Sequence, residues 1–166
     1  MIKDVFNEDI ALSNADVIVN ASNGFGYMGG NSGLITRKLG VAESIHYYSS
    51  GLVEALAMGA CQAKGKLGYF AGSVFVTAAP GMNCKYILHA VTMWLPGSKA
   101  RLRTIKKLVP KIVVKAEALG AKTVAIPMLG AGTGRLNETE VYDIFQQAFE
   151  NSSVEYLVYR VHRIHV

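Results

Sequence analysis

The sequence predicts one α/β domain in which helices cover both faces of a mixed or parallel sheet. Short apolar, β-branched runs, typical of buried strands, alternate with stretches of helical periodicity along the whole chain. Two glycine-rich loops each follow such a strand directly and precede a helix. The 166 residues suit a single domain, 1–166, and no linker, repeat or change of composition indicates a second one.

The first half of the chain contains strands and helical stretches separated by glycines. Helical periodicity covers 34–39 and about 42–63, with breaks at Gly40 and near Gly51. Pro80-Gly81 marks a turn between two strands. The strands predicted here are 17–19, 73–77 and 86–91.

The second half repeats this alternation with clearer helix signals. Apolar residues with helical spacing predict a helix from Arg101 to Leu119, in which Pro110 indicates a kink or a late start. A further helix covers about 138–149, with Asn137 as its N-cap and Glu140 as a capping-box partner. The remaining strands are 123–126 and 154–161.

Composition excludes several classes of protein. Hydrophobic residues make up 51% and charged residues 17%, which excludes disorder. No run approaches the ~18 apolar residues of a membrane span, and the N-terminus is acidic where a secretory signal is basic. We therefore expect a soluble, cytoplasmic protein with no membrane partner. Cys61 and Cys84 lack zinc-site spacing and are expected to be small buried hydrophobes, so no metal or cofactor is implied.

The two glycine loops, 20–33 and 130–134, are the main functional signal. Ligands of open α/β sheets bind at the carboxyl ends of strands, beside helix N-termini. Glycine lets backbone N–H groups converge on phosphate oxygens, and a following helix adds its positive dipole end. Two such loops predict a ligand with a diphosphate. The alternative interpretation is that both are only tight strand-to-helix turns.

Several motifs occur in the order found in a known family. They are Asp16–Asn23, Gly29-Gly30-x-x-Gly33, Thr77, Lys85–Val91 and Ala125–Gly134. Together they cover nearly the whole chain, which resembles a macro domain. The resemblance implies a three-layer α/β/α sandwich with a mixed central sheet. It also implies a cleft across the strand ends that binds ADP-ribose or a derivative, with an ADP-ribosylated protein as a candidate partner.

The resemblance assigns roles at the two ends of this ligand. Asp9 matches the acid that accepts from the adenine amino group, Ile10 is its backbone neighbour, and Tyr159 matches the aromatic that packs on the adenine face. Asn23 matches the residue that hydrogen-bonds the terminal ribose and is the one catalytic candidate. Asn20 is expected to hold the loop shape by bonding backbone groups.

The glycine loops are expected to enclose the phosphates, mostly through backbone amides. One side consists of Gly29, Gly30, Asn31 and Ser32, and the other of Gly130, Ala131, Gly132, Thr133 and Gly134. Arg135 follows the second loop and is placed to contact a terminal phosphate, which suits ADP-ribose 1''-phosphate.

One departure from the family limits the prediction of catalysis. The branch that hydrolyses ADP-ribosyl esters and O-acetyl-ADP-ribose has an Asp where this chain has Ser32. A serine cannot activate water as a carboxylate does near neutral pH. Two hypotheses therefore remain: hydrolysis at the terminal ribose of ADP-ribose 1''-phosphate, O-acetyl-ADP-ribose or an ADP-ribosyl adduct, or non-catalytic reading of ADP-ribose or its polymer.

A basic run supplies a third hypothesis. The chain has 17 Lys and Arg against 12 Asp and Glu, a net charge of +5, which suits anionic partners. No acid interrupts the bases of 99–115: Lys99, Arg101, Arg103, Lys106, Lys107, Lys111 and Lys115. A solvated helix face is the default explanation, and an RNA or poly-ADP-ribose surface is the alternative. The aromatic residues are not clustered along the chain, so base-specific RNA recognition is not expected.

Overall fold

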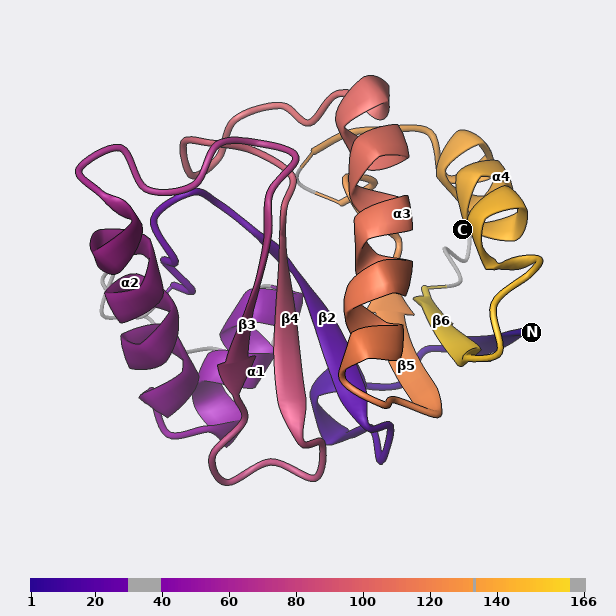
Figure 1. Cartoon of the computed structure of the whole chain (residues 1–166), viewed down its shortest axis with the longest axis horizontal. Helices are drawn as coiled ribbons and strands as arrows, with labels where there is room; N and C mark the ends of the chain where they lie inside the picture. The colour runs from indigo at the N-terminus through magenta and orange to yellow at the C-terminus, as the bar shows by residue number, and fades with distance from the viewer. Residues whose placement is uncertain (30–39, 133, 162–166) are drawn as a thin grey trace, which may run out of the picture.

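The computed structural model describes residues 1–29, 40–132 and 134–161. Within them one sheet has the strand order β1-β6-β5-β2-β4-β3 (Figure 1). The strands are β1 (Ile2–Phe6), β2 (Val17–Ser22), β3 (Val74–Ala78), β4 (Tyr86–Val91), β5 (Thr123–Pro127) and β6 (Glu155–Arg160). The helices are η1 (Ile10–Leu12, a 3-10 turn), α1 (Val41–Tyr48), α2 (Leu52–Lys64), α3 (Leu102–Ala118) and α4 (Glu138–Phe149). Only the β3–β4 pair is antiparallel in this part of the chain, so the sheet is mixed, as predicted.

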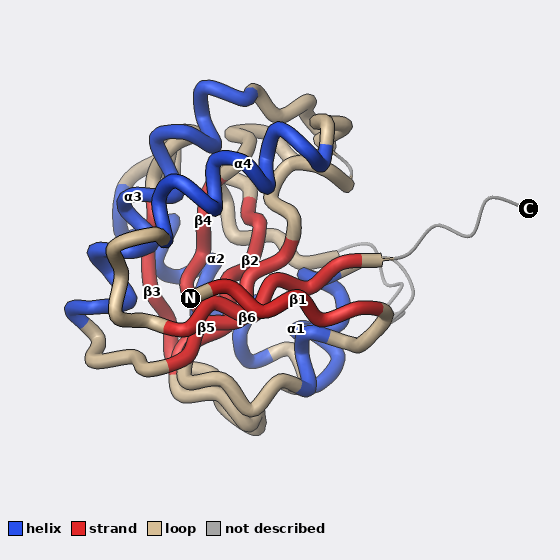
Figure 2. The backbone as a smooth tube through the Cα atoms, turned by 90° about the vertical axis from the view of Figure 1, so that its right-hand side faces the viewer, coloured by secondary structure: helices blue, strands red, loops and turns tan. Residues whose placement is uncertain are grey.

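Two apolar clusters, one on each face of the sheet, make the fold a three-layer sandwich (Figures 1 and 2). Alternate residues of β2 enter different clusters: Val17 and Val19 pack with α3 and α4, whereas Ile18 packs with α1 and α2. This follows from the two-residue period of a strand. The predicted α/β/α architecture is thereby confirmed.

The predicted helix boundaries are largely confirmed. Gly51 has φ 79° and separates α1 from α2, and Asn137 Oδ1 accepts the N–H of Glu140 at 3.2 Å, which caps α4. Of the two alternatives given for Pro110, a kink or a late start, the late start is wrong, because α3 begins at Leu102 and continues through Pro110. Its apolar side chains are buried on both sides of the proline, and this burial outweighs the lost backbone hydrogen bond. The helical stretch predicted at 34–39 lies outside the described residues.

The register between β2 and β5 is fixed at their amino ends by Asp16. Its Oδ2 accepts the N–H groups of Lys122 at 2.8 Å and Thr123 at 3.3 Å. These bonds hold the pKa of the Asp16 carboxyl below its usual value, and the bond from Lys122 has the largest effect. Since β2 and β5 are parallel neighbours, the same alignment brings their carboxyl ends together at the opposite edge of the sheet.

Both cysteines are buried in the cluster formed with α1 and α2. Cys61 and Cys84 are free thiols, and burial raises the pKa of each to about 11. Such thiols stay protonated at neutral pH and behave as small apolar side chains, as predicted.

A buried histidine links three strands through side chains. His89 of β4 is fully buried; its Nδ1 lies 3.2 Å from Asn20 Nδ2 and its Nε2 lies 3.0 Å from Thr77 Oγ1. The Phe75 ring stacks on the imidazole with centroids 4.6 Å apart. Burial lowers the pKa of His89 to about 3, so the imidazole is neutral in the folded protein.

This histidine makes stability depend on pH. Because its folded pKa lies below the unfolded value of about 6.5, its contribution is complete above pH 6.5 and is lost as pH falls toward 3. We expect the free energy of unfolding to fall through this window by up to about 1.4 kcal/mol per pH unit from His89 alone. Urea unfolding of the wild type and of His89→Asn between pH 6.5 and 4 measures the difference. Equal pH slopes for the two proteins would contradict the assignment.

Candidate functional site

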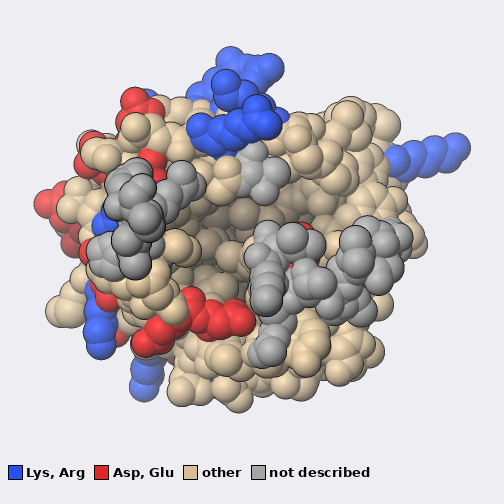
Figure 3. Space-filling model, turned by 180° about the vertical axis from the view of Figure 1, so that it is seen from behind, with Lys and Arg blue, Asp and Glu red and all other residues tan. Residues whose placement is uncertain are grey.

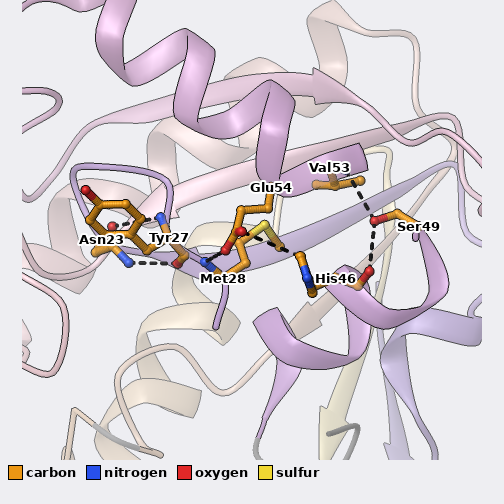
Figure 4. A network of polar contacts seen from close by, with 7 residues as sticks. All are labelled: Asn23, Tyr27, Met28, His46, Ser49, Val53 and Glu54. Atoms are coloured by element: carbon orange, nitrogen blue, oxygen red, sulfur yellow. Dashed lines mark hydrogen bonds and ion pairs between the residues drawn. The ribbon is translucent and has the colours of Figure 1, made fainter. Parts of the chain in front are cut away.

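The first glycine loop takes its shape from the Asn23 side chain, at the end of β2. Asn23 Oδ1 accepts the N–H group of Phe25 at 3.0 Å. It also accepts the N–H of Tyr27 at 3.3 Å, and Nδ2 donates to the Tyr27 carbonyl at 2.9 Å (Figure 4). The side chain is buried. Three bonds therefore tie the loop to the side-chain amide of Asn23. They use only one of the two N–H groups of Nδ2.

Asn20 has a different role from the predicted one. It lies inside β2, where its Nδ2 contacts His89 and not the backbone, and its buried Oδ1 has no hydrogen-bond partner among the described residues. The loop-shaping role predicted for Asn20 is performed by Asn23. The exchange follows from position, because Asn20 is still within the strand and Asn23 is the first residue after it.

A buried carboxylate supports the same loop from below. Glu54 of α2 is buried, and its Oε2 accepts the N–H of Met28 at 2.6 Å (Figure 4). Its Oε1 lies 3.9 Å from His46 Nδ1 of α1. Sequence reasoning missed this residue. The signal was an acid on the apolar face of α2, three and seven residues before the buried Ala57 and Cys61.

Close packing explains a glycine in this loop. Gly26 has φ 79°, and a Cβ there would lie 2.6 Å from the backbone carbon of Ala57 in α2. Any side chain would push the loop off the helix. Gly29, one of the predicted phosphate contacts, also has a positive φ of 89°.

The second glycine loop is a compact turn after β5. Arg135 donates its backbone N–H to Gly132 at 3.1 Å, and Leu136 donates to Gly130 at 2.8 Å. A Cβ at Gly134 would lie 2.6 Å from the Gly130 carbonyl oxygen and 2.7 Å from the Cβ of Ala100. Gly132, in contrast, is exposed, and no described atom lies within 4 Å of where its Cβ would be. The tip of the loop therefore offers open backbone.

The predicted adenine end is brought together by the pairing of β1 with β6. Val5 pairs with Tyr159, and Asp9 follows β1 a few residues later. Asp9 is half-buried and caps η1, with its Oδ1 accepting the Ala11 N–H at 3.0 Å. Ile10 is buried, and the half-buried Tyr159 packs against the same apolar cluster. Ile10 and Tyr159 thus belong to one apolar cluster on the same face of the sheet, and Asp9 directly precedes Ile10.

Four of the remaining predicted site residues lie in parts of the chain that the structure does not describe. Gly30, Asn31, Ser32 and Thr133 lie outside the described residues. Ala131 is buried, and Arg135 is exposed with a positive φ of 62°.

The side of the molecule toward which β1 and β6 run is hollowed (Figures 2 and 3). The visible wall of this hollow consists of residues other than Lys, Arg, Asp and Glu, with basic residues gathered above it and acidic ones below (Figure 3). Among the described residues, no group of three His, Cys, Asp or Glu is placed to hold a metal. No helix within the described ranges is long and apolar enough to cross a membrane.

The chain belongs to the macro domain family, whose sequence profile matches residues 19–145. Its fold resembles the macrodomain of Mycobacterium tuberculosis DarG, with a TM-score of 0.80 at 22% identity over 96% of this chain and 97% of that one. It also resembles Thermosipho africanus DarTG, solved in complex with ADP-ribose, with a TM-score of 0.78 at 19% identity over 98% of this chain and 43% of that one.

The chain is shorter than the curated proteins that it matches. A protein of Aquifex aeolicus is 31% identical over 120 residues, which is 72% of this chain and 64% of that protein. A protein of Aeropyrum pernix is 27% identical over 133 residues, which is 80% of this chain and 62% of that protein. The chain thus spans less than two thirds of these relatives.

The packing of the second loop predicts a contrast between two glycines. Gly134→Ala should lower the melting temperature by several degrees, because its Cβ meets the backbone of Gly130 at 2.6 Å. Gly132→Ala should leave it within about a degree, since its Cβ points into open space. Thermal unfolding followed by circular dichroism measures both. Equal losses in the two variants would contradict the described loop.

Proposed function

We propose that this chain binds ADP-ribose in the hollow at the carboxyl ends of its strands, with the diphosphate between the two glycine loops. The observation that carries the proposal is the juxtaposition of these loops on the parallel neighbours β2 and β5, each shaped by contacts that leave little room for side chains. Membership of the macro domain family and the resemblance to DarTG, solved in complex with ADP-ribose, support it.

Backbone N–H groups supply the phosphate contacts in this proposal. The wall of the hollow is largely uncharged (Figure 3), so convergent amides at Gly29 and around Gly132 hold the diphosphate where no cation crowds it. Arg135, exposed beside the second loop, is placed for a terminal phosphate when the derivative carries one.

The adenine is held at the β1–β6 edge. Asp9 uses Oδ1 to cap η1, and its Oδ2 remains as an acceptor for the exocyclic amine of adenine. Tyr159 of β6 is half-buried and packs on the base. AMP therefore fills this edge but not the second glycine loop, and binds more weakly than ADP-ribose.

The reaction proposed for this site is hydrolysis at the terminal ribose. Asn23 Nδ2 keeps one N–H for a ribose hydroxyl while its other bonds fix the loop. With Ser32 in place of the family acid, the phosphates of the substrate itself orient the water. Candidate substrates are ADP-ribose 1''-phosphate, O-acetyl-ADP-ribose and ADP-ribosyl adducts, including an ADP-ribosylated protein.

The second candidate function is a reader that binds ADP-ribose or its polymer without chemistry. Two observations favour it: Ser32 replaces the carboxylate, and the Asn23 amide is mostly engaged in holding its own loop. The cytoplasm is the compartment we propose for either function.

Calorimetry tests the binding proposal. ADP-ribose should bind one to one and at least tenfold more tightly than AMP or NAD. Asp9→Asn keeps the cap on η1 but turns a donor toward the adenine amine, so it should weaken binding about tenfold, on the order of 1.4 kcal/mol. The matched control, Glu8→Gln, removes one exposed neighbouring charge and should bind as the wild type does. Equal affinity of the Asp9 variant would contradict the adenine assignment.

Turnover distinguishes the hydrolase from the reader. Wild-type protein is incubated with ADP-ribose 1''-phosphate and O-acetyl-ADP-ribose, and released phosphate or acetate is measured. The hydrolase predicts release that Asn23→Ala abolishes. ADP-ribose affinity falls too, because the same change removes the three bonds that shape the first glycine loop. The reader predicts no release by either protein. Release that survives in Asn23→Ala would contradict the role of this residue.

A further inference from the structure

A second pocket, apart from the proposed cleft, lies between the segment that follows β4 and the first turns of α3. Its volume is about 670 Å³. Four cationic side chains line it, and no residue predicted for the ADP-ribose cleft does. The four are Lys99, Arg101, Arg103 and Lys107.

These cations are not neutralised by the described part of the protein. The lining of the pocket contains no Asp or Glu among the residues that the structure describes. The ion pairs found among the described residues join His46 to Glu54 and Arg160 to Asp4. Neither pair involves a residue that lines the pocket. A concave site with several uncompensated positive charges attracts anions from solution.

The helix that begins at the pocket, α3, carries positive charges at its N-terminal end, which is also the positive end of the helix dipole. α3 starts at Leu102, has no acid in its first turn, and its N-cap Arg101 makes no side-chain capping bond. Helix stability favours acids at this end and bases at the other. The cations at the start of α3 therefore add to the positive dipole end, an arrangement that suits an anionic ligand and not the isolated helix.

Aromatic rings adjoin the cations. Trp94 lines the pocket, and its Nε1 donates to the Leu67 carbonyl at 2.8 Å, which fixes the ring. The rings of Phe25 and Phe70 lie 5.8 and 5.9 Å from it, and Phe70 is 58% exposed. The aromatic residues are not clustered along the chain, but the fold brings these three rings together from distant segments.

We propose that this pocket binds the phosphodiester backbone of a single-stranded nucleic acid, with a base stacked on the aromatic cluster of Phe25, Phe70 and Trp94. Cations beside exposed rings are the combination that binds unpaired strands, because every base has a face to stack. A duplex keeps its bases stacked on one another. An acidic peptide or an anionic membrane surface would bind through the cations alone and offers no base to stack on the rings. The observations therefore favour a single strand.

The pocket and the second glycine loop adjoin the same short segment. Ala100 stands between the lining residues Lys99 and Arg101, and its Cβ is 2.7 Å from the position of a Cβ at Gly134 in the second glycine loop. The residues that line the pocket include none of the contacts predicted for the cleft. Phe25 belongs to the first glycine loop, but its ring lies against Trp94, with centroids 5.8 Å apart. Free ADP-ribose in the cleft should therefore not displace the strand fully.

The experiment uses the chain and a fluorescein-labelled strand of twelve thymidines. Trp94 is the sole tryptophan, so quenching of its emission reports stacking directly. We expect anisotropy and quenching to rise together, an affinity that falls with log salt at a slope of roughly −0.7 per phosphate contacted, and weaker binding of the matching duplex. Inorganic polyphosphate, which has no bases, should bind without the quenching.

Variants locate the site. Arg103→Glu with Lys107→Glu should weaken binding of the strand at least tenfold. Lys115→Glu with Lys106→Glu makes the same charge change on exposed positions of α3 outside the pocket and should cost clearly less. Phe70→Ala should reduce both affinity and quenching several-fold. Circular dichroism melts show that each variant is folded.

Four results would overturn the proposal. Equal loss in both charge-reversal pairs would indicate attraction to net charge alone. Binding without Trp94 quenching would exclude stacking, and equal binding of polyphosphate with the same response would exclude the base. Full displacement by ADP-ribose would place the strand, or a poly-ADP-ribose-like ligand, in the cleft. That last result leaves the proposed function standing, whereas failure of ADP-ribose to bind at all would leave this pocket untouched.

Discussion

The parallel pairing of β2 with β5 is the constraint on which the rest of the structure depends. Asp16 aligns the two strands at their amino ends through bonds to the backbone of Lys122 and Thr123. Because the strands run the same way, their carboxyl ends meet, and each ends in a glycine loop. A slip of this register would exchange the buried faces of both strands and separate the loops. The site is thus a consequence of how the sheet is ordered.

The loops themselves are shaped by polar groups and by lack of space. Asn23 holds one loop through three hydrogen bonds, and Glu54 accepts the Met28 N–H from within the helical layer. Gly26 and Gly134 are packed so closely that a methyl group would displace them. We propose that the loop backbone, held in this way, is the surface that binds a diphosphate in a hollow whose visible wall is uncharged. The charges of the chain gather elsewhere, at the start of α3 in particular.

The alternation of strands and helices was predictable because buried β-branched runs and helical periodicity are local signals. The cap at Asn137 was predictable for the same reason. Sheet order was not, since parallel neighbours are far apart in the sequence; only the structure shows that β1 pairs with β6, with Val5 beside Tyr159. The partners of Asn20 and Asn23 were exchanged because a difference of three residues decides whether a side chain lies in the strand or the loop. The aromatic cluster around Trp94 likewise depends on three separate segments.

The central claim is that the backbone of the two glycine loops binds the diphosphate of ADP-ribose. A titration with ADP-ribose followed by ¹H–¹⁵N nuclear magnetic resonance tests it directly, because every loop residue reports through its own amide. We expect the largest shifts on Gly29, Ala131 and Gly132 and smaller ones near Asp9, while Gly59 on α2 stays unchanged. Shifts confined to the first turns of α3, with both glycine loops unaffected, would contradict it.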